Sequence, residues 1–104
     1  MTAALVVIDM QNDFCLPGAD LFVAGAPDCL PHVQRAVNGF RSAGAPVIWV
    51  MRVHRADGSD VDHTRRELFA ARPFLCASPG ADLVDGLLVE DGDYVVVKRR
   101  WSAL

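Results

Sequence analysis

The 104-residue sequence is poor in the features of secreted and zinc-stabilised proteins. It has three cysteines, Cys15, Cys29 and Cys76, an odd number with no CxxC spacing among them. Such a set argues against both a disulfide framework and a structural zinc site. We therefore expect a protein of the reducing cytoplasm.

The sequence also lacks a long apolar run and an excess of basic residues. The apolar segment that begins at Ala3 is broken at Asp9 and has no basic leader, so we expect neither a signal peptide nor a membrane span. A net charge of -3 and a pI near 5.4 leave no basic face to neutralise a run of phosphates. Membranes and nucleic acids are therefore not expected as partners.

Apolar residues are abundant: they make up 52% of the sequence, and the mean hydropathy is +0.23. This content is enough for the core of one small domain over residues 1–104. No internal repeat, linker or second domain is visible. The high hydropathy fits either a compact, unusually apolar domain or apolar faces that more polypeptide or another subunit covers.

Three apolar runs without polar alternation predict buried strands of a parallel sheet, and they cover residues 3–8, 47–51 and 94–98. We expect the first of them to be a central strand, covered on both faces. A weak helical pattern covers residues 61–71, and residues 81–88 fit either a short helix or an irregular segment. The order is β-α-β-(α)-β, with connections long enough for right-handed crossovers between parallel strands.

The connection between the first two strands predicts a loop followed by the main helix. Residues 11–25 read as loop, and Pro31 is compatible with the helix only in its first turn. Gly44 supplies the helix end. From about residue 28 to 43, apolar side chains recur at helical spacing, namely Leu30, Val33, Val37 and Phe40.

Opposite charges stand at the ends of two predicted strands. Asp9 follows the first strand, and Lys98 ends the third. Ligands of open parallel α/β sheets bind outside the carboxyl ends of the strands, so we expect the two side chains to converge there as part of an active site. The simpler interpretations are that Asp9 caps the following loop and that Lys98 is a solvated strand end.

Four segments carry motifs beyond simple periodicity. Residues 5–14 read LVVIDMQNDF, and residues 93–103 read DYVVVKRRWSA. Between them, residues 41–48 read RSAGAPVI and residues 78–81 read SPGA. In this order the four segments resemble the amino-terminal portion of the isochorismatase-like cysteine hydrolases. The resemblance implies a three-layer α/β/α, Rossmann-like fold with a mostly parallel six-stranded sheet, of which about half lies in this chain.

The resemblance also implies a catalytic Asp-Lys-Cys set that acts on a small molecule. Asp9 matches the aspartate that takes the proton of the cysteine, and Lys98 matches the lysine that stabilises the thiolate. The thiolate attacks the carbonyl carbon of an amide-like bond, and water hydrolyses the acyl-enzyme. We therefore expect a cysteine hydrolase of the amidohydrolase type, without a cofactor and assembled as a homo-oligomer, that cleaves a C–N bond of a small amide or carbamoyl substrate.

The nucleophile itself is not among the matched motifs, so the resemblance places it beyond Leu104. Cys15 lies on the loop after Asp9 and fits either a nucleophile or a small buried apolar residue. Isochorismatase proper hydrolyses a vinyl ether without this cysteine, which leaves vinyl-ether hydrolysis as an alternative. Phe14 and Trp101 flank the two catalytic positions and either line the substrate pocket or belong to the core.

We expect no metal site. Relatives of the nicotinamidase type bind zinc through an Asp-x-His pair after the second strand and a further histidine. The corresponding stretch here is Arg52-Val53-His54, with His63 downstream, and an arginine cannot ligate a divalent cation. The two histidines are expected in loops, where His54 has the option of facing the pocket.

Of three other classes of protein, two do not fit the sequence and one stays open. A receiver domain needs five strands and an adjacent acidic pair that holds magnesium, and a haloacid-dehalogenase-like phosphatase needs Asp-x-Asp after the first strand. Asp9 and Asp13 are four residues apart, so neither pattern fits. A non-catalytic scaffold or assembly partner, which kept the fold and lost the nucleophile, stays open as an alternative.

Overall fold

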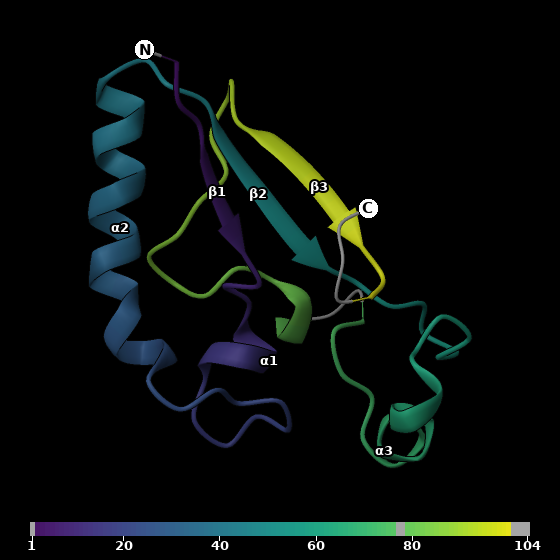
Figure 1. The fold of residues 1–104 in the computed structure, drawn as a ribbon. Helices are drawn as coiled ribbons and strands as arrows, with labels where there is room; N and C mark the ends of the chain where they lie inside the picture. Colours follow the sequence, from purple (N-terminus) through teal and green to yellow (C-terminus); the bar gives the residue numbers. More distant parts are fainter. Residues whose placement is uncertain (1, 77–78, 101–104) are drawn as a thin grey trace.

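A computed structural model describes residues 2–76 and 79–100 of the chain, and three parallel strands form its centre (Figure 1). They are β1 (Leu5–Ile8), β2 (Val47–Arg52) and β3 (Tyr94–Lys98), in the order β1-β2-β3. The three strands agree with the predicted ones. Within the described residues β2 lies between the other two strands, and β1 and β3 pair only with it, so the central place expected for the first strand stays a prediction for the complete sheet.

Helix α2 (Ala26–Ser42) covers one face of the sheet (Figure 1). Its apolar side chains pack against the core formed by Val7, Val47 and Trp49. Pro31 lies inside the helix rather than in its first turn, because Gly25, at φ 88°, starts the helix earlier than predicted. No described helix, α2 included, combines the length and the apolar character that crossing a membrane requires.

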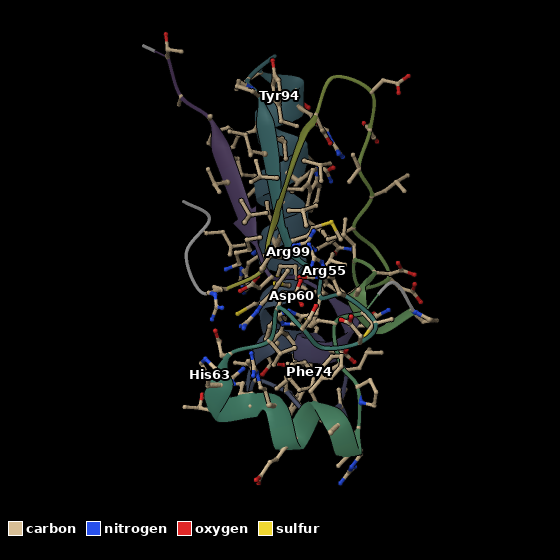
Figure 2. All side chains as sticks on the ribbon, turned by 90° about the vertical axis from the view of Figure 1, so that its right-hand side faces the viewer. Arg55, Asp60, His63, Phe74, Tyr94 and Arg99 are labelled. Carbon is tan, nitrogen blue, oxygen red and sulfur yellow. The ribbon has the colours of Figure 1, made fainter. Side chains whose placement is uncertain are left out.

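The opposite face of the sheet carries apolar side chains that remain exposed. The register places Val6 and Ile8 on the same face as Tyr94 and Val96, because cross-strand neighbours point to the same side. Their exposed fractions are 49%, 53%, 62% and 38%. Figure 2 shows Tyr94 at the end of β3 that lies away from α3. Within the described residues this face has no covering layer.

The remaining elements are short turns at the carboxyl edge of the sheet. They are α1 (Asn12–Cys15), the 3-10 turn η1 (His63–Arg65), α3 (Arg66–Ala71) and the 3-10 turn η2 (Pro79–Ala81). Thus the segment predicted as loop contains one helical turn, and the weaker helix begins as a 3-10 turn. Residues 81–88 are irregular beyond η2. Elements of one or two turns are too short to display a periodic apolar pattern.

A second, smaller core lies under α3. Its buried members are Val61, Phe69, Phe74 and Leu75. Phe69 and Phe74 meet edge to face with ring centroids 5.2 Å apart, a favourable geometry for aromatic pairs. Phe14 packs against both cores and so connects the loops to the sheet.

Candidate functional site

Asp9 and Lys98 meet at the carboxyl edge of the sheet, as expected from the sequence. Lys98 Nζ lies 3.3 Å from Asp9 Oδ2, and the side chains are 6% and 30% exposed. The strands that carry them are not neighbours, since β2 runs between them. The two side chains therefore reach each other across the end of β2. Their contact is a finding of the structure, whereas their catalytic role stays a prediction.

The backbone of Asp9 is held in an unusual conformation. Its φ is 61°, in the left-handed region that costs a non-glycine residue about 1 kcal/mol or more. The hydrogen bond from Asp9 N to Val50 O, at 3.0 Å, keeps the residue attached to β2 while the chain turns. Asp9 Oδ1 is buried, and within the described residues it accepts no hydrogen bond. A buried carboxylate oxygen of this kind is suited to accept a proton from a bound group.

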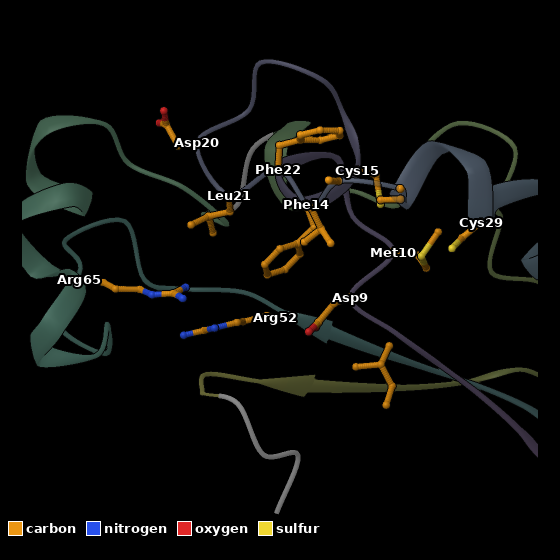
Figure 3. A pocket seen from close by; sticks show the side chains of 15 residues that line it. Asp9, Met10, Phe14, Cys15, Asp20, Leu21, Phe22, Cys29, Arg52 and Arg65 are labelled. Atoms are coloured by element: carbon orange, nitrogen blue, oxygen red, sulfur yellow. The ribbon is translucent and has the colours of Figure 1, made fainter.

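A cavity of about 650 Å³ opens beside this pair (Figure 3). Asp9 and Phe14 line it, together with Cys15, Arg52 and Arg65. Phe14 thus has both of the positions proposed for it, since it also packs into the cores. Trp101, the other residue expected to bind substrate, lies outside the described residues.

Cys15 lines the cavity but is a poor nucleophile in this environment. Its residue is only 3% exposed, and burial raises the pKa of its thiol. The neighbouring Cys29 and the carboxylate of Asp9 raise that pKa further, because negative charges disfavour a thiolate. A reactive cysteine needs the opposite surroundings, with a cation close to the sulfur. Cys15 therefore acts as a buried packing residue here, the second of its two interpretations.

The polar residues after Asp9 connect the cavity wall to the sheet. This structural role was not predicted from the sequence. Gln11 is fully buried. Its Nε2 donates to Arg52 O at 2.8 Å and to Ala81 O at 2.7 Å, and its Oε1 accepts from Arg52 N at 2.8 Å. One side chain thus joins β2 to η2. The motif was visible in the sequence, but nothing in it identified these backbone partners.

Asn12 and Asp13 hold the same loop from the helical turn α1. Asn12 Nδ2 donates to Pro79 O, and Asp13 Oδ2 accepts from Leu75 N, each at 2.6 Å. A Cβ atom at Gly80 would collide with the Asp13 carboxylate. The loop therefore approaches α1 so closely that a larger residue at position 80 would displace the Asp13 side chain.

Arg52 is buried at the end of β2, where its guanidinium group binds an acid. Its Nη2 lies 3.0 Å from Asp62 Oδ2, and Arg100 Nη1 lies 2.7 Å from the other oxygen of the same carboxylate. Burial favours a higher pKa for Asp62, but the hydrogen bonds and charges of the two arginines outweigh burial and lower the pKa. Asp62 is thus an anion between two cations.

His54 does not line the cavity; it is buried in the second core between Phe69 and Phe74. Its Nδ1 lies 3.4 Å from Asp60, which also binds Arg99 and the backbone of Arg55 (Figure 2). Burial lowers the pKa of His54, and the charge of Arg52 lowers it further. No group of three His, Cys, Asp or Glu side chains in the described ranges is placed to hold a metal ion.

Comparison with known proteins identifies the family. The profile described as the Isochorismatase domain matches residues 3–104. A protein of Arabidopsis thaliana called a probable inactive nicotinamidase is 45% identical over 96% of this chain and 53% of its own length. The ureidoacrylate amidohydrolase of Methylobacterium radiotolerans is 33% identical over 97% of this chain and 47% of its own.

A solved structure has the same arrangement of elements. The crystal structure of an isochorismatase family protein from Desulfovibrio vulgaris superposes with a TM-score of 0.90 and 44% identity, over 96% of this chain and 54% of that one. The chain thus spans about half the length of the relatives it matches. The parallel sheet with α2 on one face is therefore the isochorismatase-like α/β fold, as expected, and the chain belongs to the isochorismatase family of hydrolases.

Proposed function

We propose that the complete protein is an amidohydrolase, in which Asp9 and Lys98 activate a cysteine thiol that attacks a small amide or carbamoyl substrate. The observation that carries the proposal is the 3.3 Å pair of Lys98 Nζ and Asp9 Oδ2 at the edge of a cavity. The kinship with an amidohydrolase supports the choice of a C–N bond.

In this proposal the two oxygens of Asp9 have different tasks. Oδ2 is occupied by Lys98, whereas Oδ1 accepts no hydrogen bond in the described residues and is the oxygen that takes the thiol proton. The ammonium of Lys98 then stabilises the thiolate that forms, because a nearby cation lowers the free energy of an anionic sulfur.

The reaction proceeds by two transfers of the acyl group. The thiolate attacks the carbonyl carbon, the C–N bond breaks, and the amine leaves with the proton that Asp9 took from the thiol. Water then attacks the thioester and gives up a proton to Asp9, the carboxylic or carbamic acid departs, and the sulfur recovers the proton. Each step balances without a cofactor.

The nucleophile in this proposal is a cysteine outside the described residues. Cys15 is excluded by its burial and by the negative charges beside it, which raise its pKa. Cys76 is likewise unsuited, since burial and the charges of Asp13 and Asp60 raise the pKa of its thiol. A reactive thiolate is favoured by the opposite surroundings, with a lowered thiol pKa.

The test is turnover of small amides and carbamoyl compounds by the complete protein and by two variants. Asp9→Asn is expected to lower kcat by about 10² to 10⁴, the usual loss on removing a general base. Asp91→Asn, which changes an exposed carboxylate at a distance from the cavity, is the matched control and should leave kcat unchanged. Iodoacetamide should abolish activity in the wild type. Retention of activity in a folded Asp9→Asn variant contradicts the proposal.

A second candidate is a non-catalytic assembly partner, in the form of a homo-oligomer, and the exposed apolar face of β1 and β3 favours it. The Arabidopsis relative is called a probable inactive nicotinamidase, which supports loss of activity as a possibility within this family. A stable oligomer by light scattering, together with no turnover of any amide by the folded protein, would favour this candidate over the hydrolase.

A further inference from the structure

The end of β3 carries three consecutive basic residues, and the first of them reaches Asp9. Lys98 is the one lysine of the 104-residue sequence, and Arg99 and Arg100 follow it. Lys98 also ends the strand, and it forms the last pair of the β2–β3 ladder with Arg52. The last pair of a ladder opens more easily than the pairs inside a strand. The position of the Lys98 amine at Asp9 therefore depends on what holds the chain at the end of β3.

The segment that follows β2 holds this end of β3 through the backbone and through one arginine. Val53 N donates to Lys98 O at 3.1 Å, and Arg99 Nη1 donates to Val53 O at 2.6 Å. Arg99 Nε also lies 3.4 Å from Asp60 Oδ2, and Asp60 Oδ1 accepts from Arg55 N at 3.1 Å. Asp60 thus joins the turn after β2 to the residue after Lys98 (Figure 2).

Asp62 binds the next arginine from the same segment. Its Oδ1 lies 2.7 Å from Arg100 Nη1 and its Oδ2 lies 3.0 Å from Arg52 Nη2, so one carboxylate links the end of β2 to the chain beyond β3. Val61, between the two acids, is fully buried in the second core. The side chains of Asp60 and Asp62 are 15% and 16% exposed. Both acids therefore belong to a segment that the second core anchors.

We infer that Asp60 and Asp62 are positioning residues, a clamp on the chain after β3 that keeps the ammonium of Lys98 in place. The clamp acts through Arg99 and Arg100, not on a substrate. Each ion pair is weak, because the two arginines are 49% and 59% exposed to water. Two pairs on consecutive residues nevertheless hold the same stretch of backbone. This inference rests on the proposed hydrolase function for the role of Lys98, but the hold on Lys98 can be tested separately.

The first experiment measures how fast the amine of Lys98 is acetylated in the complete protein. The reagent is N-hydroxysulfosuccinimide acetate, and mass spectrometry of the peptide that contains Lys98 gives the rate. Each rate is divided by the rate of the same protein unfolded in urea, which removes the effect of neighbouring charges on the amine. A displaced Lys98 is more accessible, because its side chain is only 6% exposed in the ion pair with Asp9.

The test variant is the double variant Arg99→Gln/Arg100→Gln. It changes exposed side chains and spares Asp62, the acid that binds the buried Arg52. Acetylation of Lys98 should be about threefold to tenfold faster than in the wild type, the range expected for loss of two exposed ion pairs. An unchanged rate overturns the inference.

The matched control is the double variant Arg55→Gln/Arg66→Gln. It removes two positive charges from exposed positions close to the same segment, and it should leave the acetylation rate unchanged. Alkylation of the buried Cys15 by iodoacetamide, measured on the same proteins, reports opening of the main core. An increase for Lys98 that the control variant or Cys15 matches also overturns the inference, because long-range charge or general loosening then explains it.

A second measurement separates positioning from a purely structural role. Under the proposed function Lys98 stabilises the thiolate, so its displacement raises the pKa of the nucleophile. The midpoint of the pH dependence of inactivation by iodoacetamide should therefore rise by about 0.5 to 1 unit in the test variant, while KM stays unchanged. The variant Arg99→Lys/Arg100→Lys keeps both charges and should recover part of the shift. An active test variant with the wild-type midpoint contradicts the positioning role.

The outcomes keep this inference separate from the hydrolase proposal. Faster acetylation of Lys98 in the test variant but not in the control, without turnover by the wild type, supports the clamp and removes the hydrolase. Turnover that depends on Asp9, with equal acetylation rates in the wild type and the test variant, supports the hydrolase and overturns the clamp.

Discussion

The carboxylate of Asp93 is predicted to be the strongest single polar contribution to the stability of this sheet. Its Oδ2 accepts hydrogen bonds from Arg41 Nη2, from Trp49 Nε1 at 2.9 Å and from Glu90 N at 3.0 Å. These donors belong to the end of α2, to β2 and to the turn before β3. One oxygen therefore joins the helix layer to both neighbouring strands.

The size of the effect follows from the pKa. The hydrogen bond from Arg41 is the main cause that lowers the pKa of Asp93 from 3.8 to about 2, and the side chain is only 6% exposed. A shift of this size corresponds to about 2 kcal/mol of free energy of unfolding that depends on ionisation. Because the folded pKa is depressed, this stabilisation is complete above pH 4 and is lost as the pH falls through 2.

The assay is urea unfolding of the wild type and of Asp93→Asn, with tryptophan fluorescence as the signal. The variant should lose about 2 kcal/mol at pH 7, and the two proteins should converge as the pH falls through 2, because the carboxyl group of the folded wild type becomes neutral there. Asp91→Asn, at an exposed neighbouring position, should show no such loss. A difference between wild type and Asp93→Asn below about 0.5 kcal/mol at pH 7, or one that does not shrink with acid, would refute the reasoning.

Two further outcomes are expected for the buried residues His54 and Gln11. Burial lowers the pKa of His54, so the folded protein resists protonation of this side chain. The free energy of unfolding should therefore decrease as the pH falls below about 6.5, by up to about 1.4 kcal/mol per pH unit. Urea unfolding at pH 7.5 and pH 5 measures this decrease, and His54→Leu should remove it. If His54→Leu keeps the same loss between these pH values, another group is responsible. Gln11→Leu leaves the backbone groups of Arg52 and Ala81 without their hydrogen-bond partner. The free energy of unfolding should therefore fall by about 2 to 4 kcal/mol, and the midpoint of thermal unfolding should fall with it. Gln34→Leu, which removes one exposed hydrogen bond on the helix surface, is the control and should have a negligible effect. A thermal midpoint of Gln11→Leu within about 1 °C of the wild type would count against this role.

The contact of Asp9 with Lys98 was predictable because it depends on simple geometry. Each residue stands where an apolar run ends, and parallel strands present their carboxyl ends at one edge. The sequence needed to indicate only that the strands share a sheet. It did not need the strand order, and the contact forms although β2 separates the two strands.

Other features depend on contacts between distant segments that no local pattern reports. The hydrogen bonds of Gln11 join positions 41 and 70 residues away. Arg52 and Arg65 come together only because η1 folds back over the end of β2, and the sequence between them reads as a polar loop. The place of β2 between β1 and β3 in the described residues was likewise hidden, since the runs that form β1 and β2 are similarly apolar.

Because β2 separates the strands that carry Asp9 and Lys98, their contact depends on the alignment of both strands with β2. β1 and β3 share no backbone hydrogen bonds with each other in the described residues, so their relative alignment is passed on through β2 alone. A slip of one residue in either pairing moves a side chain by about 3.3 Å and turns it to the opposite face. Under such a slip the ammonium and the carboxylate no longer meet. The ion pair therefore reports on two strand alignments at once, and a chain that misaligns either strand lacks the contact between Asp9 and Lys98.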